Sequence, residues 1–388
     1  MPSINDIVQV AEALEKSPIA VLRDRCVAVR NRNATCRLCV QACHVDAIDV
    51  SANEIHLSAS ACVGCGVCAS VCPTEALVPV NPSDADLVAA AEKSGAANDG
   101  RVVLACARMA SKHVADPNRF AEVSCLGRVE ESLIVHLASR GAADVLLVDG
   151  VCATCKYGFV SPHVDEAISE ANALMAAHGS DVRASRDSKF PEELLVDSAE
   201  GMFGSTRRGF FAEAAGAAKE TAMTAAKTSM AQELGFLGNE ASIGERLRVT
   251  ESGTMPRLDM PRHDALINAM DALGEQVVSA IGSRRFASVS LDADKCNACG
   301  MCAVFCPTGA IKRADEDNPA ALLECLEFSA ADCVNCGLCA DVCWKGALTL
   351  SREVSTEQLF DFEPVAFDLS RAPKPTNNPF GKAGSFSR

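Results

Sequence analysis

The residues with the clearest chemical potential are the cysteines, of which the chain contains 21. The densest run is Cys62–Pro73, which reads CVGCGVCASVCP: two residues separate each of the first three cysteines, and three residues separate the third from the fourth. Thiolates spaced this closely can converge if the backbone coils around an inorganic iron–sulfur cluster. Gly64 and Gly66 favour such a coil, because glycine adopts positive φ without steric cost. We therefore predict an iron–sulfur cluster at this run.

Three further runs repeat the pattern. Cys296–Pro307 and Cys333–Cys343 keep the same spacing, whereas in Cys26–Cys43 nine residues separate the first two cysteines. We interpret Val27–Thr35 as a loop inserted between those two cysteines. Zinc sites use pairs of Cys-x2-Cys, and disulfides between such close cysteines would be strained, so neither alternative fits four runs of this kind.

The four runs resemble those of bacterial two-cluster ferredoxins, in which the fourth cysteine of each run binds the cluster of the other run. The resemblance implies two dicluster units, at 26–80 and 287–350, with four 4Fe–4S clusters. The expected ligand sets are site 1 (Cys26, Cys36, Cys39 and Cys72), site 2 (Cys43, Cys62, Cys65 and Cys68), site 3 (Cys296, Cys299, Cys302 and Cys343) and site 4 (Cys306, Cys333, Cys336 and Cys339). His44 and Trp344 replace the proline that follows the fourth cysteine elsewhere, and we expect both to pack over a cluster rather than to act in catalysis.

Residues 84–200 have a different character, because apolar runs alternate there with helical stretches. Strands are predicted at 101–106, 120–125, 143–150 and near Val182, and helices at 84–93, 129–140 and 162–178. Strands that alternate with helices favour a parallel sheet with right-handed crossovers. We therefore expect a small α/β module between the two dicluster units.

Four cysteines of this module follow predicted strands. Cys106 and Cys125 close the first two strands, and Cys152 and Cys155 follow the third. The carboxyl ends of parallel strands meet at one edge of a sheet, where open α/β folds bind ligands. We call these four residues the sheet-edge site and expect a separate metal centre there. Zinc is an alternative occupant, since four cysteines satisfy a tetrahedral zinc ion.

The segment VSCLGRVEESLIVHLASRGAADVLLVDGVCATCKYG, 123–158, resembles the delta subunit of the methyl-viologen-reducing hydrogenase family. The shared pattern is a cysteine at a strand end, a Gly-Arg turn, a helix, Gly-Ala-Asp, an apolar strand and a closing cysteine pair followed by an aromatic residue. The resemblance covers roughly 100–160 and implies a 2Fe–2S cluster held by Cys106, Cys125, Cys152 and Cys155. It also implies electron transfer between a hydrogenase or formate dehydrogenase and a partner such as heterodisulfide reductase.

The expected fold class is α+β with α/β: two ferredoxin-like dicluster domains flank a small parallel-sheet α/β domain, and helical linkers join them. The expected boundaries are an N-terminal helix at 1–25, a dicluster domain at 26–80, the α/β domain at 84–200, a helical linker at 201–286, a second dicluster domain at 287–350 and a C-terminal tail at 351–388.

Composition excludes several classes of function. The formal net charge of −15 argues against binding to nucleic acid, whose phosphates would be repelled. The sequence has no apolar run long enough to span a membrane, and its N-terminus lacks the features of a signal peptide, so we expect a cytoplasmic protein with reduced thiols. Dinucleotide-binding, P-loop and hydrolase motifs are also missing from the sequence.

We therefore expect a multi-cluster electron-transfer subunit of a cytoplasmic oxidoreductase complex, not itself catalytic, that works in a hetero-oligomer. The expected partners are a catalytic oxidoreductase subunit and, as one option, a flavin-bearing subunit. Two alternatives stay open: an enzyme with a cluster-based reactive site near Cys325, the one cysteine outside the five sites, and a redox-sensing iron–sulfur protein.

Overall fold

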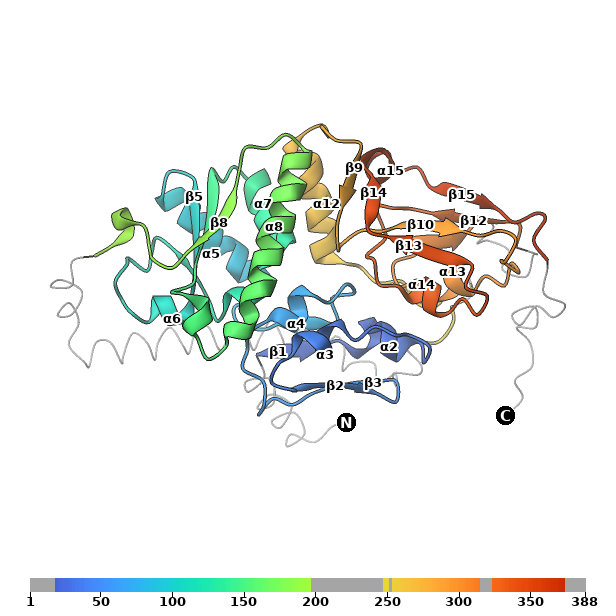
Figure 1. Cartoon of the computed structure of the whole chain (residues 1–388), viewed down its shortest axis with the longest axis horizontal. Coiled ribbons are helices and arrows are strands. Elements are labelled where there is room, and N and C mark those ends of the chain that lie inside the picture. Colours follow the sequence, from blue (N-terminus) through green and yellow to red (C-terminus); the bar gives the residue numbers. More distant parts are fainter. Residues whose placement is uncertain (1–17, 197–246, 251–252, 315–322, 374–388) are drawn as a thin grey trace.

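The computed structural model describes residues 18–196, 247–250, 253–314 and 323–373. In Figure 1 the chain forms an α/β module (84–196, mostly green), an N-terminal unit (18–80, blue) and a C-terminal unit (280–373, orange and red). The expected helix over 1–17, the linker over 201–246 and the end of the tail at 374–388 lie outside the described residues.

The α/β module contains a four-stranded parallel sheet with the strand order β6-β5-β7-β8, in agreement with the predicted alternation of strands and helices. Its elements are α5 (Asp84–Ala97), β5 (Arg101–Cys106), α6 (Ala107–Ala110), β6 (Ala121–Val123), η2 (Leu126–Arg128), α7 (Glu131–Ser139), β7 (Asp144–Val148), η3 (Cys152–Thr154), η4 (Gly158–Val160), α8 (Ser161–Ala177), β8 (Ala184–Asp187) and η5 (Glu192–Leu194).

Both faces of this sheet are covered, which explains why β5 is apolar throughout. Val102 and Leu104 belong to the large hydrophobic core that includes side chains of α5, α7 and α8. Val103 and Ala105 point to the other face and pack in a smaller cluster with Phe190. Parallel strands buried on both faces are near-continuous apolar runs rather than alternating ones.

The N-terminal unit is built from two antiparallel strand pairs, β1 with β4 and β2 with β3. Its elements are β1 (Ile19–Val21), η1 (Arg23–Arg25), α2 (Val27–Arg30), α3 (Leu38–Ala42), β2 (Ile48–Ser51), β3 (Glu54–Leu57), α4 (Val67–Ser70) and β4 (Leu77–Pro79). The predicted N-terminal helix is wrong for residues 19–21, whose backbone pairs with β4 instead, while residues 23–25 form the short 3-10 helix η1. The predicted loop Val27–Thr35 is also partly wrong, since it begins with the short helix α2.

The C-terminal unit contains the predicted pair of strands β10 and β13, the pair β9 and β14, and a three-stranded sheet β11-β12-β15. The helix before the unit and the elements of the unit are α12 (Pro261–Leu273), β9 (Ala280–Gly282), β10 (Ser288–Leu291), α13 (Met301–Phe305), β11 (Ile311–Arg313), β12 (Cys325–Phe328), α14 (Leu338–Asp341), β13 (Leu348–Ser351), β14 (Glu353–Ser355), α15 (Thr356–Phe360) and β15 (Val365–Asp368).

Two predicted boundaries differ from the structure around this unit. Residues 353–368, assigned to a tail, form β14, α15 and β15, because β14 pairs with β9 and β15 pairs with β12. The same pairing places β9, at the end of the predicted helical linker, in the C-terminal unit. The predicted helix over 263–280 runs from Pro261 to Leu273 and stops at Gly274, whose φ of 115° a helix does not permit.

Arginines that are mostly, though not fully, buried join the three units where they meet. Arg285, between β9 and β10, donates from Nη2 to the carbonyl oxygen of Ser70 in the N-terminal unit at 2.7 Å. The same guanidinium binds the carboxylates of Glu130 and Glu131 in the α/β module. Arg284 adds a second bond to Glu131, with Nη2 2.6 Å from Oε2. One pair of arginines therefore holds all three units.

A third arginine, Arg262 in the first turn of α12, reinforces this junction. Its Nη1 and Nη2 donate to the carbonyl oxygens of Ala69 and Leu77, each at 3.1 Å. Its backbone N–H donates to Oε1 of the buried Glu75 at 3.0 Å. Both contacts anchor α12 to the N-terminal unit.

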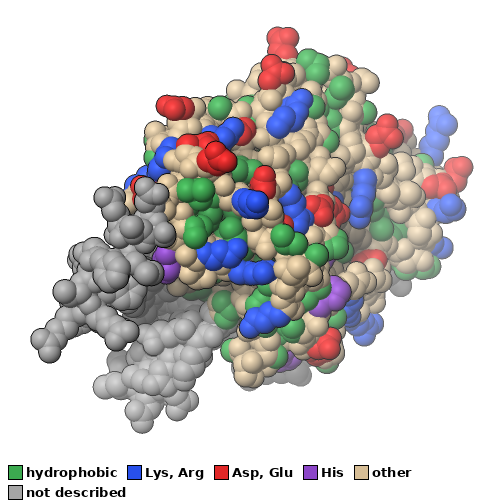
Figure 2. Space-filling view, turned by 60° about the vertical axis from the view of Figure 1, so that its left-hand side comes forward, with side chains coloured by type: hydrophobic (Ala, Val, Ile, Leu, Met, Phe, Trp, Pro, Cys, Tyr) green, Lys and Arg blue, Asp and Glu red, His purple; other side chains and the backbone are tan. Residues whose placement is uncertain are grey.

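Figure 2 shows one face of the molecule, on which basic and acidic side chains are interspersed with hydrophobic ones. Among the described helices none combines the length and the apolar character needed to cross a bilayer.

Glu131 provides a test of the junction. Burial alone would raise the pKa of Glu131, but the ion pairs with Arg285 and Arg284 lower it to about 2, so the carboxylate is charged at neutral pH. Glu131→Gln leaves two buried guanidinium groups short of a partner and should lower the free energy of unfolding by about 3–5 kcal/mol. Anaerobic chemical denaturation of the cluster-loaded chain, followed by circular dichroism, measures this change.

Glu166→Gln is the matched control. Glu166 also pairs with Arg284, at 3.2 Å, but half of its side chain is exposed. Its loss should cost less than about 1 kcal/mol, because exposed ion pairs are weak. Equal effects of the two substitutions would contradict a junction that depends on buried charge.

Candidate iron–sulfur sites

Each cysteine run ends in the same turn. The third residue after the fourth cysteine has a positive φ in all four runs: Asp46 (49°), Glu75 (51°), Gly309 (81°) and Gly346 (59°). A buried alanine follows at the fourth position after the cysteine: Ala47, Ala76, Ala310 and Ala347. All four runs share this alanine in the sequence, but the cysteine spacing alone does not indicate its role.

This turn directs a backbone N–H at a cysteine sulfur in three of the runs. The bonds run from Ala47 to Cys43 (3.4 Å), from Ala76 to Cys72 (3.3 Å) and from Ala347 to Cys343 (3.3 Å). Hydrogen bonds to ligand sulfurs are one of the means by which proteins set the potential of an iron–sulfur cluster. The turn therefore orients the fourth cysteine of each of these runs and supplies a donor to its sulfur.

The structure brings together the four thiols expected at site 1. Burial raises the pKa of Cys39 to about 12, and the nearby thiols of Cys72, Cys26 and Cys36 raise it as well. Cys72 comes from the second run and the other three come from the first. The exchange of the fourth cysteine between runs is therefore compatible with this fold.

The thiols expected at site 2 are also neighbours. Burial raises the pKa of Cys68, and so do the nearby thiols of Cys65, Cys62, Cys39 and Cys43. Cys39 belongs to site 1, so sites 1 and 2 lie next to each other inside the N-terminal unit.

Sites 3 and 4 each surround a cavity in the C-terminal unit. The four cysteines of site 3 line one cavity together with Asn297, Lys345 and apolar residues. The four cysteines of site 4 line another, with Val289, Pro307 and Leu350 among the other residues. Burial raises the pKa of Cys339, which is also influenced by thiols of its own site and by Cys302 of site 3. Sites 3 and 4 are therefore adjacent.

The donor sets fit multi-iron clusters. Buried thiols that crowd together resist ionisation, and bound metal cations reverse this effect because they favour the thiolate. In the part of the chain that the structure describes, no three His, Cys, Asp or Glu side chains are placed to hold a single metal ion. The four cysteines that line the cavity of site 3, and the four that line the cavity of site 4, supply the all-thiolate donor set that a 4Fe–4S cluster uses.

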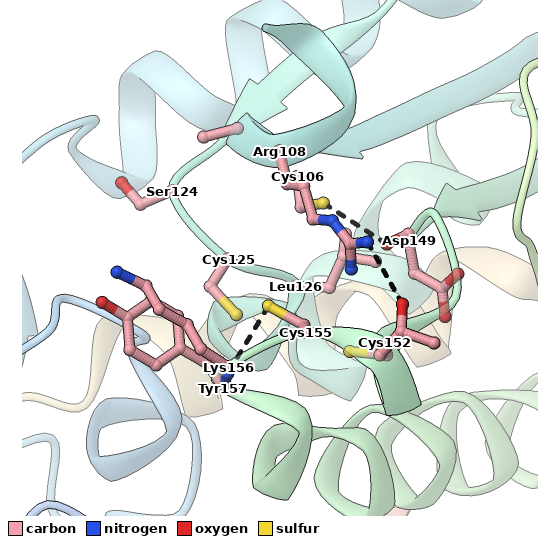
Figure 3. A pocket seen from close by; sticks show the side chains of 12 residues that line it. Cys106, Arg108, Ser124, Cys125, Leu126, Asp149, Cys152, Cys155, Lys156 and Tyr157 are labelled. Carbon is pink, nitrogen blue, oxygen red and sulfur yellow. Dashed lines mark hydrogen bonds between the residues drawn. The ribbon is translucent and has the colours of Figure 1, made fainter. Parts of the chain in front are cut away.

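The sheet-edge site is the largest of these cavities, at about 380 Å³. Cys106, Cys125, Cys152 and Cys155 all line it, and Figure 3 shows their sulfur atoms turned toward the cavity. Burial raises the pKa of Cys125 to about 12. As the strand pattern predicts, these thiols gather at the carboxyl edge of β5, β6 and β7.

The loop that carries Cys152 is held in an unusual conformation. Gly150 and Val151 both have positive φ, 63° and 66°, which is rare for a β-branched residue such as valine. Asp149 stabilises the loop: its carboxylate accepts the N–H of Val151 at 2.7 Å and pairs with Arg186 at 2.5 Å. Arg108 also holds the loop, because its Nη2 donates to Oγ1 of Thr154 at 3.1 Å.

The sheet-edge site lies against site 2. A Cβ added to Gly127, two residues after Cys125, would lie 2.5 Å from Cγ2 of Val67 and 3.1 Å from the carbonyl oxygen of Cys65. Cys65 is also among the groups that raise the pKa of Cys125, after burial. Only glycine at 127 allows this close approach between the α/β module and the N-terminal unit.

His44 and Trp344 stand where a proline follows the fourth cysteine in the other two runs, and their surroundings differ. His44 packs on Phe159 of the α/β module with 4.9 Å between ring centroids, which adds to the same contact between units. Trp344 is 68% exposed, with Nζ of Lys345 4.1 Å from its ring centroid. The expectation that Trp344 packs over a cluster is therefore wrong, since most of its surface faces solvent.

Cys325 lies at the start of β12 and does not line the cavity of site 3 or that of site 4.

Two family models match parts of the chain. Residues 295–347 match the 4Fe-4S dicluster domain, and residues 55–78 match the 4Fe-4S binding domain. The first range includes every cysteine of sites 3 and 4, and the second includes the run Cys62–Cys72. These matches support an iron–sulfur electron-transfer protein with ferredoxin-type domains at two positions that bind 4Fe–4S clusters. No curated protein and no solved structure matches the chain.

The exchange of the fourth cysteine between runs can be tested by single substitutions. Cys72→Ala and Cys39→Ala should each remove about four irons per chain and abolish the same 4Fe–4S signal in the EPR spectrum. Cys68→Ala should remove the other signal of that unit, and Cys325→Ala is the control that keeps the full iron content. Loss of the same signal from Cys72→Ala and Cys68→Ala would show that the fourth cysteine stays with its own run.

Gly127→Ala tests the contact between the α/β module and the N-terminal unit. The added methyl group meets Val67 and Val160, so overpacking should cost about 1–3 kcal/mol and lower the thermal midpoint of the anaerobic protein. Gly282→Ala is the matched control, because nothing lies within 4 Å of its added Cβ. An unchanged midpoint for Gly127→Ala would mean that this contact is looser than described.

Proposed function

We propose that this chain is a multi-cluster electron-transfer subunit of a cytoplasmic oxidoreductase complex, and that it relays electrons between a catalytic subunit and a second redox module. The catalytic subunit would be of the hydrogenase, formate dehydrogenase or heterodisulfide reductase kind. The proposal assigns a 4Fe–4S cluster to each of sites 1 to 4 and a 2Fe–2S cluster to the sheet-edge site. The proposal rests mainly on the observation that twenty of the cysteines fall into five groups of four.

The arrangement of the thiols supports conduction rather than catalysis. A cluster whose irons are all bound by cysteine has no iron position left for a substrate, so it supplies one-electron exchange. The sheet-edge cavity is lined by all four of its cysteines, which leaves each iron of a 2Fe–2S cluster with two thiolates. Four thiolates can satisfy either a 2Fe–2S cluster or a zinc ion, so the iron and zinc content decides between them.

Iron, sulfide and zinc analysis of anaerobically purified protein tests the proposal, together with EPR of the reduced sample. We expect about eighteen irons per chain, four for each of four clusters and two for the fifth, with a 2Fe–2S signal. About sixteen irons with one zinc would make the sheet-edge site structural. Turnover of a substrate by the chain without a partner subunit would contradict the assignment as a relay.

A further inference from the structure

The insertion in the first cysteine run is part of the core. Val27, Ala28, Val29 and Ala34 are buried, although the sequence suggests a loop between two ligands. They belong to a hydrophobic cluster that also contains Leu338 of α14. Because α14 lies in the last cysteine run, the insertion connects the first run of the chain to the last.

Hydrogen bonds fix this contact between the units. The backbone N–H of Thr35 donates to Oδ2 of Asp341 at 2.7 Å, and its hydroxyl donates to Oδ1 at 3.0 Å. Thr35 directly precedes Cys36 of site 1, and Asp341 lies two residues after Cys339 of site 4. One threonine and one aspartate therefore hold the backbone of site 1 against the backbone of site 4.

Arg30, at the end of α2, extends from the N-terminal unit toward site 4. Its Nη2 donates to the carbonyl oxygen of Pro256 at 2.7 Å. The segment around Pro256 is bonded in turn to the backbone on both sides of Cys306, because Met255 donates to Val304 at 2.9 Å and Leu258 donates to Pro307 at 2.8 Å. The guanidinium therefore lies next to the backbone that carries a site 4 thiol.

The environment of Arg30 indicates a cation directed at site 4. The side chain is buried, and its Nε has no hydrogen-bond partner within the described residues. Burial lowers the pKa of Arg30, and this effect is opposed by the thiol of Cys306, by the carboxylate of Asp24 and by the thiol of Cys336; both thiols belong to site 4. A buried positive charge beside a cluster stabilises its reduced, more negative form and so raises its potential.

Together with the contacts between the other pairs of sites, this arranges the five sites in a line. The sheet-edge site contacts site 2 through Gly127, and site 2 lies next to site 1 through Cys68 and Cys39. Site 4 lies next to site 3 through Cys339 and Cys302. The contact made by the insertion supplies the link between site 1 and site 4.

We propose that the insertion Val27–Thr35 is the bridge that joins the two ferredoxin-type units into one path, and that Arg30 of one unit sets the potential at site 4 of the other. The five sites then follow the order sheet-edge site, site 2, site 1, site 4, site 3. This order differs from their order in the sequence, and it puts the sheet-edge site and site 3 at the two ends.

The inference rests on the proposed function and adds to it. A reduced redox protein docks at one end and an oxidised redox protein docks at the other. Each electron that enters the path leaves it again, so no bond is made or broken in the chain and no proton is taken up. Trp344, which directly follows Cys343 of site 3, is exposed.

The test measures the reduction potentials of the clusters by EPR-monitored titration of the full chain. Arg30→Gln should shift one 4Fe–4S centre to lower potential while the iron content stays the same. Arg30→Lys, which keeps the charge, should restore most of the shift. Arg32→Gln is the matched control, because it removes an exposed charge from the same insertion and should leave every potential unchanged.

A second substitution keeps the test decisive if Arg30→Gln does not fold. Asp341→Asn removes a negative charge that raises the pKa of Cys36, after burial and the thiol of Cys72, and it preserves the shape of the side chain. It should move a 4Fe–4S centre to higher potential, opposite to Arg30→Gln. Unchanged potentials in an iron-replete variant of either kind would overturn the bridge.

The results separate the two proposals. Zinc in place of iron at the sheet-edge site would remove one end of the path and contradict the proposed function, while the shift caused by Arg30→Gln would still support the contact between sites 1 and 4. If all five clusters are reducible but their reduction potentials do not change when Arg30 or Asp341 is substituted, the relay function stands and the bridge is refuted.

Discussion

The arrangement of the whole molecule depends on buried charge at the junction of its three units. Arg284 and Arg285 bind Glu131, and Arg285 also reaches the backbone of the N-terminal unit at Ser70. A buried carboxylate and a buried guanidinium are each unfavourable alone, so every unit needs the others to satisfy its charged groups. Rigid docking follows, and with it the fixed relation between cysteine sites that belong to different units. A fixed relation between sites suits an iron–sulfur electron-transfer protein, because electron tunnelling falls steeply with distance.

A second constraint acts inside each ferredoxin-type unit. The chain must present four thiols from two runs around one cavity, and it does so with a repeated turn that places a positive φ before a buried alanine. Ala76 is an example: its side chain is buried, and its backbone N–H donates to the sulfur of Cys72 at 3.3 Å. The repeat is therefore a requirement of sulfur coordination as well as of folding.

The departures from the repeat are the places where the units meet. The nine residues between the first two cysteines of the first run form α2 and provide Thr35, which bonds to Asp341. His44, which stands where two other runs have proline, packs on Phe159. Gly127 has a comparable role in the α/β module, where the absence of a side chain lets the sheet-edge site approach site 2. Residues that look irregular within one unit are explained by the neighbouring unit.

Cluster chemistry and most local elements could be predicted from the amino-acid sequence. Cysteine spacing predicted four runs of iron–sulfur type, and apolar runs ending in Cys106 and Cys125 predicted strands whose ends share one sheet edge. These features depend on short stretches of chain, because ligand spacing and strand periodicity are local. The strand β1 was missed for the opposite reason: residues 19–21 pair with residues 77–79, far along the chain.

How the units are joined could be learned only from the folded chain. Nothing local in Val27–Thr35 shows that it is buried against α14, and nothing near Arg30 in the sequence shows that it lies beside Cys306. Long-range packing and the pairing of buried charges determine both contacts. Cysteine spacing thus predicts which thiols form each site, whereas the fold determines which sites are neighbours, because that depends on contacts between residues hundreds of positions apart.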